Sequence, residues 1–454
     1  MRKIIQYMMM ALIAVVLASC ANDISEESTP TVKSNIRFVV DDFPMFEKPS
    51  TRTIGEEDKG KTAWAVGDEI CVKLESKKLG TQTATLKYNG VKFEIQDGNS
   101  LCYLEGEPVT AYAYYAPNRR WRNGSLDFKD IFGNPNGTAE FLEATCTVHY
   151  GDNNYVDISF ANATRNYSRL RIATIPKTEI KVDADVFSPT DNSNRLYMTY
   201  TLTSDEKGNA YLYGTFYNNS IVTVKYRGAT LKTYKFSKET ENAKSYALDA
   251  TVISANSAEE IKSAIKQEVA NSKTAIILNL ASDAGDNEFK TIREAFKNVR
   301  DATIDLTLIG CKEIPADGLK ELNALKSIFL PDVTKIGMNA LSRCVYLEEI
   351  CAPNVSTIDE RAFAGFIMLE KVTLGELTEV RGEANSGGGI FDDDNWTPYI
   401  DLYLPKNQEV MKGEFDENSN QYIWKPTGEK YFASPDYDNG IFLGYQFNSV
   451  KSWE

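Results

Sequence analysis

The sequence has 454 residues, a formal net charge of −14, and 24 tyrosines and 21 phenylalanines, an aromatic content that suits β-structure. This length has room for two or three domains. The negative charge argues against nucleic acid or an anionic membrane surface as the partner, because both require a basic patch. A histidine metal cluster or a Ser-His-Asp relay would depend on the one histidine, His149, which we expect on a strand surface.

Residues 1–19 are predicted to be a lipoprotein signal peptide. Basic residues precede an apolar run, Ile4 to Leu17, which is too short to span a membrane. The run ends in Leu17-Ala18-Ser19-Cys20, which resembles a bacterial lipobox. The resemblance implies cleavage between Ser19 and Cys20 and attachment of diacylglycerol and palmitate to Cys20. Several acyl chains give firm membrane anchoring. The alternative is an ordinary signal peptide with a fortuitous cysteine.

Residues 20–34 are polar and are predicted to form a flexible tether. The acidic stretch from Asn22 to Glu27 resembles the surface-export signal of Gram-negative lipoproteins. The resemblance implies a location on the outer membrane, facing outward.

Residues 35–252 are predicted to form a sandwich of antiparallel sheets, because short alternating strands follow one another closely. The expected hairpins run from Ala84 to Ile95 with a two-residue turn at Asn89-Gly90, from Tyr197 to Phe216 around Lys207-Gly208-Asn209, and from Ile221 to Phe236 around Arg227-Gly228.

The same region resembles the fimbrillin-like family. The matching residues are Thr51-Arg52-Thr53, Trp64 with Gly67-Asp68 and Ile70, Ala111 to Pro117, and Val156 to Phe160 followed by Ser168 to Ile172. The resemblance implies two transthyretin-like β-sandwich halves, residues 35–170 and 171–252. Pilins of this family are cut after an arginine near the N-terminus, and Arg52 is the candidate here. The alternative is that Arg52 is an ordinary loop residue.

Residues 253–305 are predicted to form two atypical units that cap a solenoid. Ser257 to Glu260 is a capping box before an apolar helix face that runs from Ile261 to Val269. A strand from Ala275 to Leu280, a second helix around Phe289 to Val299 and a strand from Ala302 to Leu308 follow.

Residues 306–405 repeat themselves every 22 residues. Ile328, Ile350 and Val372 occupy equivalent positions, and Leu325, Leu347 and Leu369 form a second such series. A period of this length is typical of a solenoid whose units stack to bury their apolar sides, with short parallel strands about 4.8 Å apart.

The pattern from Pro331 to Leu347, repeated from Pro353 to Leu369, resembles the BspA-like leucine-rich repeat family of bacterial surface proteins. The resemblance implies an adhesion role. The fourth unit departs from the pattern through an insertion at 383–389, which we place in a loop.

The aromatic segment 406–454 is predicted to cap the far end of the stack. The alternative is a small sugar-contacting surface, since aromatic side chains stack on the apolar faces of sugars. Cys311 and Cys344 occupy core positions of the repeat, and Cys351 is predicted to lie on the outer strand face. The acidic stretches Asp283 to Glu288 and Asp392 to Asn395 do not fit an EF-hand, and we expect solvated loops there.

The combined prediction is a mainly β, surface-anchored interaction protein without enzymatic activity or cofactor. Its outer-membrane lipid contact is Cys20, and its repeat face binds a protein or a glycan. The outward strand positions begin with Asp305, Thr307 and Ser327, and the candidate ligand contacts among them are Phe329, Glu349, Cys351, Lys371, Thr373 and Tyr403. The alternatives are a fimbrial subunit assembled by strand exchange and a glycan-capture lipoprotein.

Overall fold

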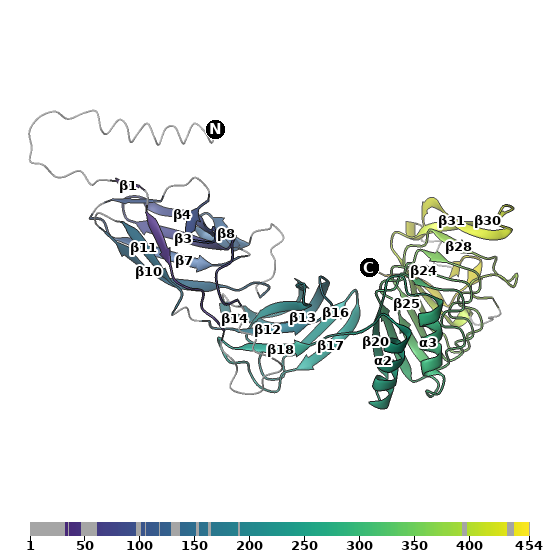
Figure 1. The fold of residues 1–454 in the computed structure, drawn as a ribbon. Coiled ribbons are helices and arrows are strands. Elements are labelled where there is room, and N and C mark those ends of the chain that lie inside the picture. Colours follow the sequence, from purple (N-terminus) through teal and green to yellow (C-terminus); the bar gives the residue numbers. More distant parts are fainter. Residues whose placement is uncertain are drawn as a thin grey trace, which may run out of the picture. The chain divides into compact units, whose positions relative to one another are not determined.

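The computed structural model describes residues 32–34, 36–46, 61–96, 101–104, 106–117, 119–128, 137–150, 154–161, 165–188, 191–392, 397–433 and 440–453. These fall into two compact units, the first holding strands β1 to β11 and the second everything from β12 onward. Strands dominate both (Figure 1). Among the described residues, no helix combines the length and apolar character needed to cross a membrane.

The first unit is built on a seven-stranded sheet in the order β2-β11-β10-β7-β3-β4-β5, in which β2 runs parallel to β11 and the other pairs are antiparallel. Apolar residues alternate along each strand, so one side of the strand faces the core. In β11, for example, Val156 and Ile158 are buried. The strands are β1 (Val32–Ser34), β2 (Arg37–Val40), β3 (Glu69–Ser76), β4 (Gly80–Tyr88), β5 (Phe93–Ile95), β6 (Cys102–Leu104), β7 (Val109–Tyr115), β8 (Arg119–Arg122), β9 (Ser125–Phe128), β10 (Leu142–His149) and β11 (Tyr155–Ser159).

The second unit begins with a two-sheet sandwich, one sheet ordered β15-β12-β18 and the other β14-β13-β16-β17. Its strands are β12 (Ser168–Ala173), β13 (Glu179–Ser188), β14 (Asp191–Thr203), β15 (Asn209–Gly214), β16 (Ile221–Tyr226), β17 (Ala229–Lys235) and β18 (Ser245–Asp249). Since β12 begins at Ser168 and pairs with β15 and β18, this sandwich includes residues ahead of the predicted boundary at 171.

Two of the three expected hairpins are present. Ile221 to Phe236 turns at Arg227 and Gly228, both with positive φ (44° and 94°). The hairpin from Ala84 to Ile95 also forms, but the prediction that its turn has two residues was wrong, because Tyr88 pairs with Phe93. The Asn89 carboxamide accepts hydrogen bonds from the amides of Val91 and Lys92, which widens the turn and leaves Val91 86% exposed.

The third hairpin prediction, Tyr197 to Phe216, was wrong. β14 pairs with β13, and β15 pairs with β12 in the other sheet of the sandwich. Gly208 (φ 81°) therefore turns the chain from one sheet to the other, and the β carbon of a larger residue there would lie 2.3 Å from the Thr174 carbonyl oxygen.

The solenoid starts with β19 (Ile253–Ala255), α2 (Ala258–Ala270), β20 (Ala275–Leu280), α3 (Asp286–Phe296) and β21 (Ile304–Ile309), as expected for its first two units. The Ser257 hydroxyl caps α2 by accepting a hydrogen bond from the Glu260 amide. The Glu260 carboxylate in turn accepts a hydrogen bond from the Asn256 amide. In a standard capping box it would accept from the amide of the N-cap residue itself, here Ser257. Both helices bury apolar faces in the same core as the repeats.

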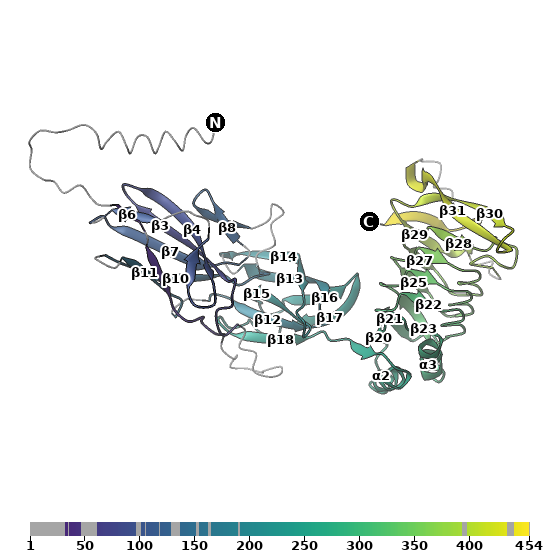
Figure 2. The same ribbon diagram turned by 45° about the horizontal axis from the view of Figure 1, so that its top comes forward.

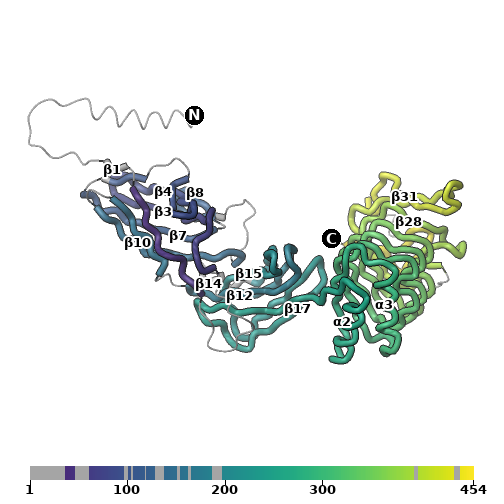
Figure 3. Tube along the Cα trace, viewed as in Figure 1, coloured from purple at the N-terminus to yellow at the C-terminus, as the bar shows by residue number. Residues whose placement is uncertain are grey.

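The coils from β22 to β28 add parallel strands to two sheets, and Figures 2 and 3 show the coils stacked. Sheet one is ordered β19-β20-β21-β23-β25-β27-β29-β34 and sheet two β22-β24-β26-β28-β31-β30. The additional elements are β22 (Glu313–Ile314), β23 (Leu325–Phe329), β24 (Lys335–Ile336), β25 (Glu349–Ala352), β26 (Thr357–Ile358), β27 (Lys371–Leu374), β28 (Glu379–Arg381), η1 (Thr397–Tyr399), β29 (Asp401–Pro405), β30 (Glu409–Asp416), β31 (Gln421–Lys430), η2 (Tyr431–Ala433), β32 (Ile441–Phe442), β33 (Tyr445–Gln446) and β34 (Ser449–Trp453).

The 22-residue period sets the register of these sheets. Ile328 pairs with Ile350, and Ile350 pairs with Val372. Cys311 and Cys344 are fully buried in the solenoid core.

The C-terminal segment continues both sheets of the solenoid. β31 joins β28 in antiparallel orientation, and β34 joins β29 in parallel. Tyr431, Tyr445 and Phe447 are buried in the core of the stack. These three aromatic residues therefore pack internally, which favours a cap over a sugar-contacting surface for this part of the segment.

Candidate interaction surface

Sheet one presents outward side chains on β21, β23, β25, β27, β29 and β34, and we call this the sheet face. Strand alternation buries Leu306, Ile328, Ile350, Val372 and Leu402 and turns their neighbours outward. The pairing aligns two outward rows, one of Asp305, Ser327, Glu349, Lys371, Asp401 and Ser449, and one of Thr307, Phe329, Cys351, Thr373, Tyr403 and Lys451.

Tyr403 is flanked by two ammonium groups. The Nζ of Lys371 lies 5.6 Å and the Nζ of Lys451 lies 5.5 Å from the centre of its ring. Each lysine is also paired with a carboxylate, Lys371 with Glu349 at 2.7 Å and Lys451 with Asp401 at 3.0 Å. Cations near an aromatic ring are attracted by its electron-rich face, so the ring and the two pairs form one amphipathic cluster.

Hydrogen bonds further favour the charged forms of this cluster. The bond to Glu349 raises the pKa of Lys371. The bonds that Asp401 accepts from the Ser449 hydroxyl (2.6 Å) and from Lys451 lower the pKa of its carboxyl. A partner would therefore meet fixed charges of both signs around one aromatic ring.

Cys351 lies between Phe329 and Thr373 in the second outward row and is half-buried. Burial and the negative charge of Glu349 raise the pKa of its thiol to about 11. Since the thiolate is the reactive form, Cys351 acts at neutral pH as a small apolar contact.

Phe329 faces outward as expected, but part of its ring meets another segment of the second unit. A β carbon built on Gly228, in the β16–β17 turn, would lie 3.4 Å from the tip of the Phe329 ring. Next to it, the buried carboxylate of Asp332 accepts a hydrogen bond from the Tyr226 hydroxyl (3.0 Å) and pairs with Arg227 (2.8 Å). The strands from β25 onward therefore offer the more open half of the sheet face.

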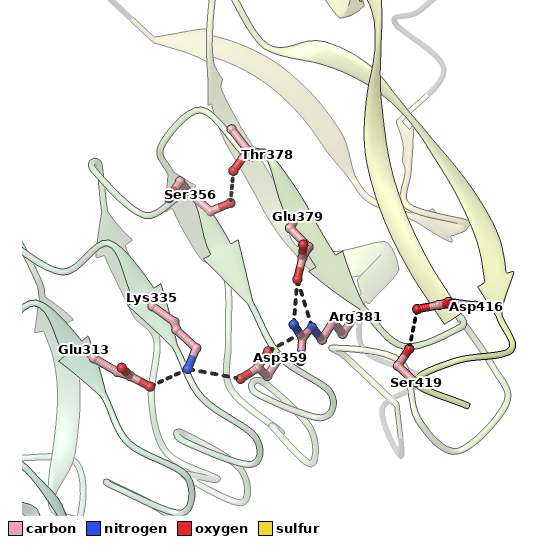
Figure 4. A network of polar contacts seen from close by, with 9 residues as sticks. All are labelled: Glu313, Lys335, Ser356, Asp359, Thr378, Glu379, Arg381, Asp416 and Ser419. Atoms are coloured by element: carbon pink, nitrogen blue, oxygen red, sulfur yellow. Dashed lines mark hydrogen bonds and ion pairs between the residues drawn. The ribbon is translucent and has the colours of Figure 1, made fainter. Parts of the chain in front are cut away.

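Sheet two carries a ladder of ion pairs (Figure 4). Lys335 lies between Glu313 (2.6 Å) and Asp359 (3.8 Å), and Arg381 lies between Asp359 (3.7 Å) and Glu379 (2.8 Å). The hydrogen bond to Glu313 raises the pKa of Lys335. Three of these four pairs link successive coils and the Arg381–Glu379 pair lies within β28, so the charges stabilise the stack and are already partnered.

The two acidic stretches differ: Asp283 and Asp286 are exposed, as expected, and of the second stretch the structure describes only Asp392. Asp392 is 4% exposed, and its carboxylate accepts hydrogen bonds from the Gly389 amide (2.8 Å) and the Tyr445 hydroxyl (2.7 Å). Burial alone would raise the pKa of Asp392, but these bonds hold it below its usual range. Glu288 accepts from the Gly285 amide at the start of α3. In the described ranges, no three histidine, cysteine or acidic side chains are grouped closely enough to hold a metal ion.

His149 lies at the end of β10, with its ring stacked on Tyr155 and its Nε2 2.9 Å from Asp157, as expected for a strand-surface histidine. Ser19, Cys20 and Arg52 lie outside the described residues. Sequence reasoning missed Lys451, because the segment 406–454 was predicted to be a cap or a sugar-contacting surface and not a further strand of the sheet face. The alternation of Ser449, Val450 and Lys451 was the available signal, since it matches an outward, inward and outward strand pattern.

Comparison with known proteins supports this architecture. Residues 278–387 match the BspA type leucine-rich repeat region in six copies, a range that includes the end of β20 and the whole of helix α3. Leucine-rich repeats are in general interaction modules without enzymatic activity, and the BspA type suggests surface adhesion or protein interaction. No curated protein matches the chain significantly.

Proposed function

Because residues 278–387 form a BspA-type leucine-rich repeat region, we propose that this protein is a surface-anchored lipoprotein that binds a host or microbial macromolecule through its sheet face. The observation that carries the proposal is the cluster of Tyr403, Lys371 and Lys451 with their two carboxylates. Binding hot spots are enriched in tyrosine, and a charged rim selects the partner. Cys351 and Thr373 extend the same surface on the neighbouring strands.

The Tyr403→Ala variant tests this surface. We expect about a tenfold or greater loss of affinity for immobilised partner, because truncating an interface tyrosine typically removes 1 to 2 kcal/mol or more. The melting temperature should stay unchanged, since Tyr403 faces outward from the sheet. Adhesion of the purified chain to an array of matrix proteins and glycans supplies the measurement.

Tyr197→Ala is the matched control, because Tyr197 is a tyrosine 72% exposed on β14, away from the sheet face. It should leave adhesion intact. Equal binding by the wild-type and Tyr403→Ala proteins would place the ligand elsewhere. Retardation by polysaccharide in a native gel, lost in Tyr403→Ala, would favour the glycan-capture alternative over a protein partner.

The anchoring part of the proposal rests on the Leu17-Ala18-Ser19-Cys20 motif. In Cys20→Ser, we expect labelled palmitate incorporation to disappear and the protein to leave the outer-membrane fraction, because the thioether to diacylglycerol cannot form. Cys351→Ser, which changes a half-buried cysteine, should keep the label. Undiminished labelling of Cys20→Ser would reject this anchor. Protease treatment of intact cells then tests outward display, since a surface protein is digested.

A fimbrial subunit is the second candidate, and one observation favours it. β2 precedes Arg52 in sequence and buries Phe38 in the core of the first unit, where it pairs with β11. Cleavage after Arg52 would remove this strand and open a sheet edge that a strand from another subunit can fill. Ladders of linked subunits on unboiled gels would support this role, and native protein whose N-terminus is intact at Cys20 would exclude it.

A further inference from the structure

The solenoid has a third side, formed by the turns that lead from sheet two back to sheet one, and we call it the turn side. It carries a hollow of about 770 Å³, within the size range of small-molecule sites. Its lining includes three cations and no carboxylate. The lining includes Lys320, Ser342, Arg343, Arg361, Gly365 and Ile367.

Two arginines of this hollow occupy backbone positions that an arginine seldom takes. Arg343 and Arg361 both have positive φ (59° and 55°). The equivalent positions on neighbouring coils, 22 residues away, also have positive φ and hold Gly365 (φ 79°), Glu321 (φ 61°) and Asn339 (φ 55°), of which glycine and asparagine tolerate this conformation best. Positive φ therefore belongs to the turns of every coil on this side, and an arginine side chain is not what these backbone positions require.

The hollow also holds an unused polar group. Ser342 is 3% exposed, and its hydroxyl has no hydrogen-bond partner among the described residues. A buried polar group without a partner is unfavourable, and a bound ligand or water can supply the missing hydrogen bond. On the next coil the equivalent residue is Ala364, so packing at this position does not require a hydroxyl.

Two of the three cations take part in surface ion pairs, and the third, Arg361, donates a hydrogen bond to the Gly387 carbonyl oxygen (2.8 Å). Arg343 and Glu321 are 3.5 Å apart with side chains 63% and 56% exposed, and Lys320 pairs with Asp317 at the surface. Exposed pairs of this kind contribute little, so an incoming anion can compete for the cations. The stem of Arg343 passes close to Gly365, where a β carbon would lie 3.2 Å from its Cγ.

The backbone around the hollow is already paired between coils. The Arg343 amide donates to the Ala364 carbonyl (2.7 Å), the Leu341 amide to Ala362 (2.9 Å) and the Glu321 amide to Ser342 (2.9 Å). A peptide strand would find few free backbone partners here, so recognition rests on side chains. The exposed Ile367 beside the arginines adds an apolar surface of the kind that packs on a sugar ring.

We propose that this hollow is a second binding site, separate from the sheet face, for an acidic oligosaccharide whose carboxylate is held by Arg343 and Arg361. Arginine pairs with carboxylates through two parallel hydrogen bonds. The net charge of −14 disfavours a dense polyanion and favours a ligand with few charges on a sugar scaffold.

Titration calorimetry on the full-length chain with 3′-sialyllactose and with a hyaluronan tetrasaccharide tests the proposal. We expect at least one of them to bind and neutral lactose not to bind. Arg343→Gly and Arg361→Asn copy the residues of the neighbouring coils, so they suit the backbone and should not lower the melting temperature. Each should weaken binding about tenfold or more, since a hydrogen bond to a charged group contributes about 1.5–3 kcal/mol. Arg343→Lys should restore part of the affinity.

Arg122→Ala is the matched control, because Arg122 is 66% exposed and forms a surface pair with Asp127, as Arg343 does with Glu321. This variant and Tyr403→Ala should both bind the oligosaccharide normally, which separates the hollow from the sheet face. The proposal fails if neither oligosaccharide binds at millimolar concentration, if both arginine variants bind like the wild type, or if an acidic hexapeptide binds more tightly than both sugars.

Discussion

Replacing Leu347 with alanine is expected to lower the free energy of opening of the central coils by about 2–5 kcal/mol. Leu347 is fully buried, in line with Leu325 and Leu369 on the adjacent coils, so truncation leaves a cavity between stacked units. In a solenoid each unit is stabilised by its nearest neighbours, and a weak coil therefore weakens both of its interfaces. Hydrogen exchange of the amides in β23, β25 and β27 measures the change directly.

Ile367→Ala is the control for this substitution. Ile367 is 53% exposed, and surface truncations usually change stability by no more than about 0.5 kcal/mol. Protection factors in β25 should therefore stay close to wild type. If Leu347→Ala left exchange in all three strands unchanged, stacking across this position would not hold the coils together.

The repeat architecture followed from sequence because one local rule fixes it. Residues 22 apart meet on adjacent strands, as Ile328 does with Ile350, so counting along the sequence predicts both the pairing and the outward rows. The turn at Arg227-Gly228 was predictable for a similar reason, since the positive φ of a tight hairpin turn restricts the choice of residues.

The errors arose where a local pattern has more than one three-dimensional outcome. Alternation around Gly208 looks the same whether the flanking strands pair with each other or belong to opposite sheets of a sandwich. The local sequence around Asp392 predicts a solvated acidic residue. In the structure it accepts a hydrogen bond from Tyr445, a residue distant in sequence. The hollow on the turn side was invisible for the same reason, because it joins turns from three coils and depends on backbone angles that the sequence does not display.

Phe329 illustrates how a long-range contact changes the candidate surface. Its outward direction was predicted correctly from alternation, but the residue that meets its ring, Gly228, lies in a different sheet of the second unit. The same neighbourhood contains a charge that is unusual for a leucine-rich repeat core. Asp332 is only 2% exposed, and buried carboxylates require partners.

Asp332→Ala is expected to release the β16–β17 turn from the solenoid. The Asp332 carboxylate accepts hydrogen bonds from the Tyr226 hydroxyl (3.0 Å) and the Gly310 amide (2.9 Å) and pairs with Arg227 (2.8 Å). Burial and the charge of Asp332 raise the pKa of Tyr226 to about 12, so its phenol keeps its proton and donates at neutral pH. The substitution removes the carboxylate that accepts hydrogen bonds from the Tyr226 hydroxyl and the Gly310 amide. Leaving these donors without their acceptor should destabilise the contact by about 1–3 kcal/mol.

Hydrogen exchange at Gly310 and in β16 and β17 should therefore accelerate by about fivefold to a hundredfold, the range that corresponds to this cost. Asp332→Asn should give a smaller effect, because its carboxamide oxygen still accepts one hydrogen bond but carries no charge for Arg227. Asp305→Ala is the control, since Asp305 is an exposed carboxylate on the adjacent strand β21 that accepts from the Ser327 hydroxyl. Unchanged exchange in β16 and β17 of Asp332→Ala would mean that the Phe329–Gly228 packing alone holds this turn, and Phe329→Ala would then be the variant that frees it.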